Sequence, residues 1–200
     1  SISRTMSGRA LSRKAAELEP NMNEEATSIF GNVDNINIHD LTLNDCSVNT
    51  TLQTGAGILV GMVSTGLTVD NVTFNNCSVV APRMIGLVAG HLENGSFNIS
   101  NVAANGGLVE TSYVSGKSGI AGGLVGYIVN DATTKAATFT NCTVSTIVKS
   151  YMEADYYFYG KIVGLIPGNY GKDKICFVDC NANQDLSAKA AQLVDIYIRN

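Results

Sequence analysis

The sequence predicts an all-β fold, a right-handed parallel β-helix (solenoid) of about five coils with an N-terminal helical cap. Two observations predict it. Five segments share an alternation of apolar and polar residues that slips by one residue at the same point. Each of them follows a short apolar motif that ends in a small residue. Self-similarity with a period of about 20 to 50 residues is typical of repeat architectures.

The alternating segments are predicted to be bent strands. In the copy at 72–79, Val72 and Phe74 flank the polar Thr73, which is the period of a strand with one buried face. Cys77 follows Phe74 after three residues, so the chain must bend between them to keep its apolar side chains on one face. The five copies lie at 41–48, 72–79, 97–104, 137–144 and 175–182.

Each slip is preceded by Asn or Asp, the residue types that tolerate the left-handed backbone conformation of a tight corner. A strand, a corner and a second strand, repeated along the chain, predict one solenoid coil per repeat, whereas helical repeats would need a period of 3.6 residues. The corner residues are Asp45, Asn76, Asn101, Asn141 and Asp179.

The short apolar motif is predicted to open each coil. Its starting positions are separated by 30 residues (29 to 59), 28 (59 to 87), 37 (87 to 124) and 38 (124 to 162), so the later coils carry longer loops. Its copies lie at 29–31, 59–61, 87–89, 124–126 and 162–164.

These motifs carry a resemblance to a known family. The segments 121–127 (Ala-Gly-Gly-Leu-Val-Gly-Tyr) and 138–142 resemble the GLUG repeat, named for its Gly-Leu-hydrophobic-Gly core, and the resemblance covers about residues 27–182. Ala89 in place of Gly and Val102 in place of Cys depart from the repeat. Such repeats occur in secreted or surface-anchored bacterial proteins, including adhesin-like proteins and the non-catalytic parts of some immunoglobulin A proteases. The resemblance implies an extracellular or cell-surface location, with the parent protein anchored in the outer membrane or linked to the cell wall.

Three segments are expected along the chain. Residues 1–26 form an N-terminal cap, 27–182 the repeats, and 183–200 a C-terminal cap or the start of a following segment. Within the first, 8–19 places apolar residues on one helical face and ends before Pro20. Such a helix, with or without a strand before it, would cover the open end of a solenoid; the alternative is a helix that docks a partner.

Composition argues against two classes of partner. The 13 basic residues are scattered among 17 acidic ones, which does not favour a nucleic-acid surface. No apolar run reaches the length of about 20 residues that a membrane span needs. We expect neither nucleic acid nor a membrane span in this segment.

The cysteines are predicted to be packing residues. Cys46, Cys77, Cys142 and Cys180 are expected to share one inward-facing repeat position, and Cys176 to face outward. Neighbouring strands lie about 4.8 Å apart, whereas the Cβ atoms of a disulfide lie about 3.8 Å apart. Buried free cysteines behave as small hydrophobic residues. Paired metal-ligand spacings are missing, so we expect no metal or cofactor.

Catalysis is not predicted. His39 and His91 fall in different coils, and the acids share no repeat register. An outward column of Thr42, Thr73 and Thr138 is compatible with an ice-binding surface, but Asn98 and Cys176 interrupt it, which argues against that function. Together with the surface location that the GLUG resemblance implies, this favours a non-enzymatic cell-surface binding, adhesion or spacer domain of a secreted bacterial protein. The alternatives are a non-catalytic segment of a large surface protease and a carbohydrate-active β-helix protein.

Aromatic residues mark the candidate binding site. A long loop in the fourth coil contains four of the eight tyrosines of the chain within nine residues. In solenoids, such insertions map to loops on one face, which is often the binding face. The rings could stack on a glycan or contact a host surface protein; alternatively they pack against a neighbouring coil, since aromatic residues favour strands. The candidates are Tyr151, Tyr156, Tyr157 and Tyr159.

Overall fold

The computed structural model is all-β in the residues it describes. These are residues 4–7, 27–93, 95–116, 119–129, 136–151, 158–166 and 175–181, and they contain strands and turns without a helix. Every pairing between the described strands is parallel. The expected all-β class and parallel strand arrangement are therefore confirmed.

The strands form one ten-stranded sheet and two four-stranded sheets. The large sheet, sheet A, contains β1 (Arg4–Ser7), β2 (Val33–Asn44), β5 (Val60–Asn75), β8 (Ala89–Leu92), β9 (Ser96–Asn105), β12 (Val125–Ile128), β13 (Ala136–Thr140), β14 (Thr143–Val144), β17 (Val163–Leu165) and β18 (Ile175–Val178). Sheet B contains β3 (Ser47–Asn49), β6 (Ser78–Ala81), β10 (Leu108–Thr111) and β15 (Ile147–Lys149). Sheet C contains β4 (Ala56–Gly57), β7 (Met84–Gly86), β11 (Ile120–Gly122) and β16 (Phe158–Gly160).

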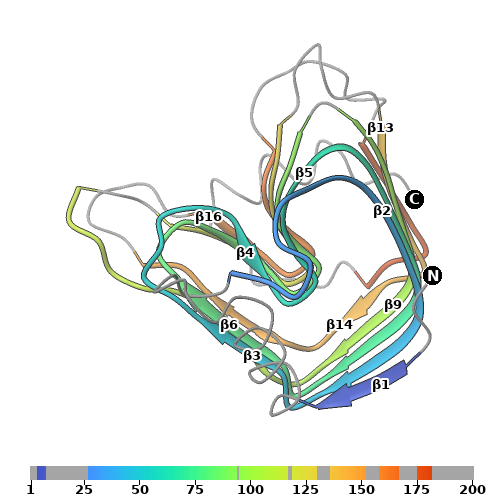
Figure 1. The fold of residues 1–200 in the computed structure, drawn as a ribbon, viewed down its shortest axis with the longest axis horizontal. Helices are drawn as coiled ribbons and strands as arrows, with labels where there is room; N and C mark the ends of the chain where they lie inside the picture. The colour runs from blue at the N-terminus through green and yellow to red at the C-terminus, as the bar shows by residue number, and fades with distance from the viewer. Residues whose placement is uncertain are drawn as a thin grey trace.

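The chain visits the three sheets in a fixed order. From β5 in sheet A it passes to β6 in sheet B and β7 in sheet C, and then returns to sheet A with β8 and β9. We call each such circuit a coil. Viewed down the stack, the circuits superpose into an outline with two arms (Figure 1). We call the sharp turn from sheet C into sheet A, for example between β7 and β8, the elbow. Because the pairing is in register, equivalent residues of successive coils form columns.

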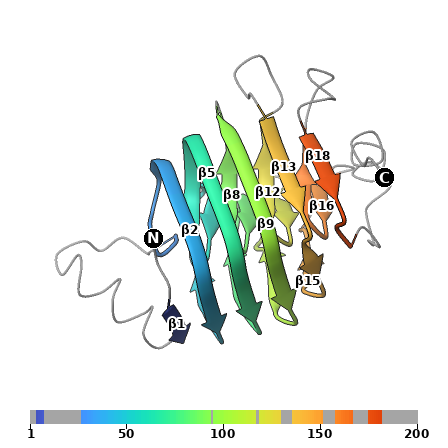
Figure 2. The same ribbon diagram turned by 90° about the vertical axis from the view of Figure 1, so that its right-hand side faces the viewer.

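In sheet A, five strands lie side by side in the order β2, β5, β9, β13 and β18 (Figure 2). Their inward side chains form the apolar core. One column is buried along its whole length, with no member more than 4% exposed, and its last two rings stack with centroids 5.0 Å apart. Its members are Ile38, Val69, Ile99, Phe139 and Phe177.

The predicted corners are confirmed in conformation, since all five corner residues have φ between 51° and 54°. Their predicted alignment is wrong. Asn101 is in register with Asn71 rather than Asn76, because Asp70 pairs with Ser100 and Val72 with Val102. Each of the first coils therefore has two left-handed corners, five residues apart. The first column holds Asp40, Asn71, Asn101, Asn141 and Asp179, and the second holds Asp45, Asn76 and Gly106.

Glycine allows the backbones to approach closely at the elbow, where sheet C turns into sheet A (Figure 1). A Cβ atom on Gly90 would lie 2.5 Å from the carbonyl oxygen of Met84, and one on Gly126 would lie 2.7 Å from that of Gly90. Ala89 pairs with Val60, so the glycine of this coil is Gly90. The expectation that Ala89 replaces the glycine of the motif is therefore wrong. This coil keeps the glycine at residue 90, one position later than the sequence pattern indicated.

The N-terminal strand β1 pairs with the second half of β2, from Leu41 to Asn44. The cap helix expected over 8–19 and the C-terminal segment 183–200 lie outside the described residues.

Candidate functional site

A surface hollow of about 450 Å³ lies on the later, longer coils. It opens beside β10, β15 and β16, which belong to sheets B and C. Its wall mixes aromatic, charged and hydroxyl side chains. The lining residues are Glu110, Thr111, Val148, Lys149, Ser150, Tyr151 and Tyr159.

Strand register explains why these side chains meet. Glu110 and Lys149 are direct partners on the neighbouring strands β10 and β15. Val148 and Tyr159 come from sheets B and C and pack against the apolar core. The hollow thus has an apolar side formed by the core and an outer side that carries one acid and one base.

Tyr151 lines the hollow, and a second exposed tyrosine, Tyr113, contacts the Tyr151 ring. Tyr113 is 51% exposed and Tyr151 is 44% exposed, which makes them two of the five most exposed large apolar or aromatic residues described. Their ring centroids lie 4.6 Å apart at an interplanar angle of 68°. This edge-to-face contact is a favoured aromatic geometry, and it leaves ring surface available to a ligand.

Hydroxyl groups fix the backbone beneath the tyrosine pair. The Tyr151 amide donates to Thr111 Oγ1, which itself lies 3.3 Å from Ser150 Oγ. Ser150 Oγ donates to the carbonyl oxygen of Gly119 at 2.8 Å. These contacts tie the segment carrying Tyr151 to the preceding coil, so the ring is held on an ordered support.

The four tyrosines that the sequence predicts as candidate binding residues differ in exposure and in whether the structure describes them. Tyr151 is exposed beside the hollow, whereas Tyr159 is half-buried and packs against the core. Tyr156 and Tyr157 lie outside the described residues. Sequence reasoning missed Tyr113, which precedes Tyr151 by one coil. No local pattern marks it, and only strand register brings the two rings together.

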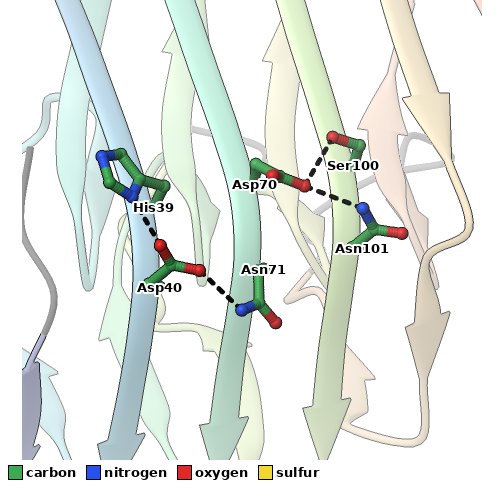
Figure 3. A network of polar contacts seen from close by, with 6 residues as sticks. All are labelled: His39, Asp40, Asp70, Asn71, Ser100 and Asn101. Carbon is green, nitrogen blue, oxygen red and sulfur yellow. Dashed lines mark hydrogen bonds and ion pairs between the residues drawn. The ribbon is translucent and has the colours of Figure 1, made fainter.

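The outward face of sheet A carries a second polar arrangement (Figure 3). Asn71 Nδ2 donates to Asp40 Oδ1 at 2.7 Å, and His39 Nδ1 lies 2.8 Å from Asp40 Oδ2. The hydrogen bond from Asn71, followed by that from His39, lowers the pKa of the Asp40 carboxyl below its usual value. One strand further, Asp70 Oδ1 accepts from both Ser100 and Asn101. These bonds link successive coils at the first corner column.

Register also corrects the predicted threonine column. Thr42 and Thr73 are partners, but the next residue in their column is Ala103, followed by Thr143. Thr138 belongs to a different column, beside Asn98. The outward face therefore mixes Thr, Asn, Ser and Ala and carries no continuous threonine ladder.

The cysteines occupy two positions rather than one. The pairing of Ser47 with Ser78 places Cys46 beside Cys77 at the second corner. Cys142 lies beside Cys180 at the first corner, where the amide of Asn181 donates to the Cys142 carbonyl at 2.9 Å. Cys180 is half-buried, which corrects its expected full burial, whereas Cys46, Cys77 and Cys142 are fully buried. Cys176 alternates with buried neighbours in β18 and is partly exposed, as expected.

The remaining histidine, His91, lies beside Tyr127 with ring centroids 4.9 Å apart. Its Nε2 atom is 3.5 Å from Glu93 Oε2 and makes no hydrogen bond. Desolvation by burial lowers the pKa of His91, with Glu93 opposing that effect.

Within the described ranges, no group of three or more His, Cys, Asp or Glu side chains is arranged to hold a metal ion. The same ranges contain no helix with the length and hydropathy of a membrane span. Comparison with models of protein families, with curated proteins and with solved structures found no match.

Proposed function

We propose that the chain is a right-handed, GLUG-like β-solenoid that acts as a non-enzymatic binding or spacer domain of a secreted or surface-anchored bacterial protein. Its ligand would be a glycan, either free or carried by a host surface protein. The observation that carries this proposal is the hollow on the long coils, which is lined by the exposed Tyr151, with the exposed Tyr113 packed against that ring.

The chemistry of the hollow matches that of a sugar. A pyranose ring offers an apolar face of C–H groups, which packs on the electron-rich face of a tyrosine ring. Its hydroxyl groups donate and accept hydrogen bonds, and Glu110, Lys149 and Ser150 supply both kinds of partner within the same hollow. Few polar groups beside an aromatic surface are typical of small-ligand sites.

The position on the fold also favours binding. A solenoid keeps a periodic core and varies the loops that connect its strands. Tyr113 and Tyr151 follow the sheet B strands β10 and β15, at the start of the connections that lead to sheet C, which are longer in these coils than in the earlier ones. Because the hollow is shallow, it would bury little ligand surface, and we expect weak binding to a single sugar with a gain from multivalent display.

A glycan array probed with the full chain, followed by titration of the strongest hit, tests the proposal. Tyr113→Ala and Tyr151→Ala should each weaken binding about tenfold or more and lower the melting temperature only slightly, because each residue is about half exposed and loses little beyond the contact between the two rings. Tyr159→Ala is the matched control. Its ring packs against the core, so this variant should lose stability.

Two results would contradict the proposal. Unchanged affinity of both exposed-ring variants for the hit would exclude the tyrosine pair as the site. Turnover of a polysaccharide or peptide by the isolated chain would contradict the non-enzymatic assignment. Absence of any hit on glycan and host-protein arrays would leave the spacer role as the supported half of the proposal.

A further inference from the structure

Two pairs of cysteines lie side by side on adjacent coils. Cys46 is in register with Cys77 at the second corner, and Cys142 is in register with Cys180 at the first. Each pair lies at a corner between strands of adjacent coils, and neighbouring parallel strands are about 4.8 Å apart. That spacing falls within the Cα separations of about 4.4 to 6.8 Å at which disulfides form.

The two pairs differ in access to solvent. Cys46 and Cys77 are both 0% exposed and are therefore sealed from an oxidant in solution. Cys142 is also buried, but its partner Cys180 is half-buried and follows the exposed Val178 and Asp179. An oxidant can therefore reach one sulfur of the Cys142–Cys180 pair and neither sulfur of the other pair.

The local electrostatics favour attack by Cys180. The hydrogen bond from Cys142 lowers the pKa of the Cys180 thiol to about 7, while the same contact and burial raise the pKa of Cys142. The thiolate is the reactive form of cysteine. Near neutral pH the half-buried Cys180 is thus the nucleophile, and the buried Cys142 lies beside it as the resolving thiol.

We propose that Cys142 and Cys180 form a redox-active dithiol, which a low-molecular-weight disulfide such as oxidised glutathione converts to a disulfide that joins adjacent coils. The Cys180 thiolate attacks one sulfur of the oxidant and releases one thiol. The Cys142 sulfur, after losing its proton, attacks Cys180 Sγ and releases the second thiol. Two S–H bonds break, one protein S–S bond forms, and the two electrons reduce one small disulfide to two thiols.

The bond should be readily reversible. The Cβ atoms of a disulfide lie about 3.8 Å apart, so the two strands must draw together at the corner. Strain of this kind makes a disulfide easier to reduce, which is typical of labile rather than structural bridges. Oxidation would fasten Cys180 to the preceding coil, and reduction would release it.

The test is to incubate the full chain with oxidised glutathione and follow free thiols and intact mass. The chain has five cysteines, so the thiol count should fall from five to three, with a peptide map joining Cys142 to Cys180. Excess reduced glutathione should restore all five. Cys142→Val should fold, because Val72 and Val102 precede it in the same column, and should stop at a glutathione adduct on Cys180.

Cys77→Val is the matched control, since it removes one member of the sealed pair. It should form the Cys142–Cys180 bond at the wild-type rate. The proposal fails if the wild-type chain only accumulates a glutathione adduct at Cys180, if the mapped bridge joins Cys180 to Cys176, or if Cys142→Val loses two thiols at the wild-type rate.

Discussion

At the scale of single residues, asparagine has two structural roles in this chain, one in its backbone and one in its side chain. Its backbone adopts the left-handed conformation at the corners, and its side chain bonds to the equivalent residue of the previous coil. Asn76 has φ 52° and donates from Nδ2 to Asp45 Oδ1 at 2.8 Å, and Asn75 and Asn105 extend a similar ladder beside it. Local conformation and inter-coil contact therefore select the same residue type.

We predict that Asn76→Gly costs less than Asn76→Ala. Glycine keeps the left-handed corner and loses only a side-chain hydrogen bond, worth about 1 kcal/mol. Alanine loses the bond and also incurs a left-handed penalty of about 1 to 2 kcal/mol. Gly106 occupies the equivalent position of the next coil with φ 62°, so the corner accepts glycine. Urea unfolding of the two variants measures the difference; equal costs would show that backbone conformation does not govern this position.

The same chemistry explains what sequence reasoning could and could not predict. Asn or Asp before an apolar residue marks a corner, and all five predicted corners adopt the left-handed conformation. However, Asn76-Cys77 and Asn141-Cys142 look alike although they belong to different corners of the coil. With two similar corners five residues apart, the pattern predicts the conformation but leaves the alignment ambiguous. Only strand register separates the two cysteine columns and brings Tyr113 beside Tyr151.

At the scale of elements, the fold depends on how the strands bend. Asn71 lies inside β5, so the first corner bends this strand without ending it. A β-bulge bends a strand in a similar way. At the elbow the chain reverses more sharply, between β7 and β8, and there the glycines matter for space rather than for φ. The short apolar motif forms this turn in the four later copies: its large residues are buried in the core, and the glycine of each copy permits the close approach of two backbones.

We predict that Gly90→Ala is far more damaging than Gly106→Ala. The new methyl group at residue 90 would meet the Met84 carbonyl oxygen at 2.5 Å and the Ala56 amide nitrogen, both backbone atoms that cannot rotate away. At residue 106 nothing lies within 4 Å, so only the left-handed penalty of about 1 to 2 kcal/mol remains. Thermal unfolding of both variants distinguishes steric crowding from backbone preference. A Gly90→Ala variant as stable as Gly106→Ala would mean that the elbow can open.

At the scale of the whole molecule, the described strands are arranged so that each contacts mainly the coil before and the coil after it. The strands β2, β5, β9, β13 and β18 are neighbours in sheet A in the order in which they occur in the chain (Figure 2). Stability in such an array is approximately a sum over coils and their interfaces. A local loss of packing should therefore unfold the nearby coils first, rather than the whole chain at once.

We predict this behaviour for Phe177→Ala, which removes a ring from the core of the last described coil. Phe177 is 4% exposed and stacks on Phe139, so its loss should cost about 3 to 5 kcal/mol. Hydrogen exchange should show lost protection in β18 and β13, with β2 and β5 retaining theirs. Phe74→Ala is the matched variant, because Phe74 is fully buried in β5 and should affect the first three coils instead. If both variants lower protection equally in every strand, the array unfolds as one cooperative unit and the solenoid description of its energetics is wrong.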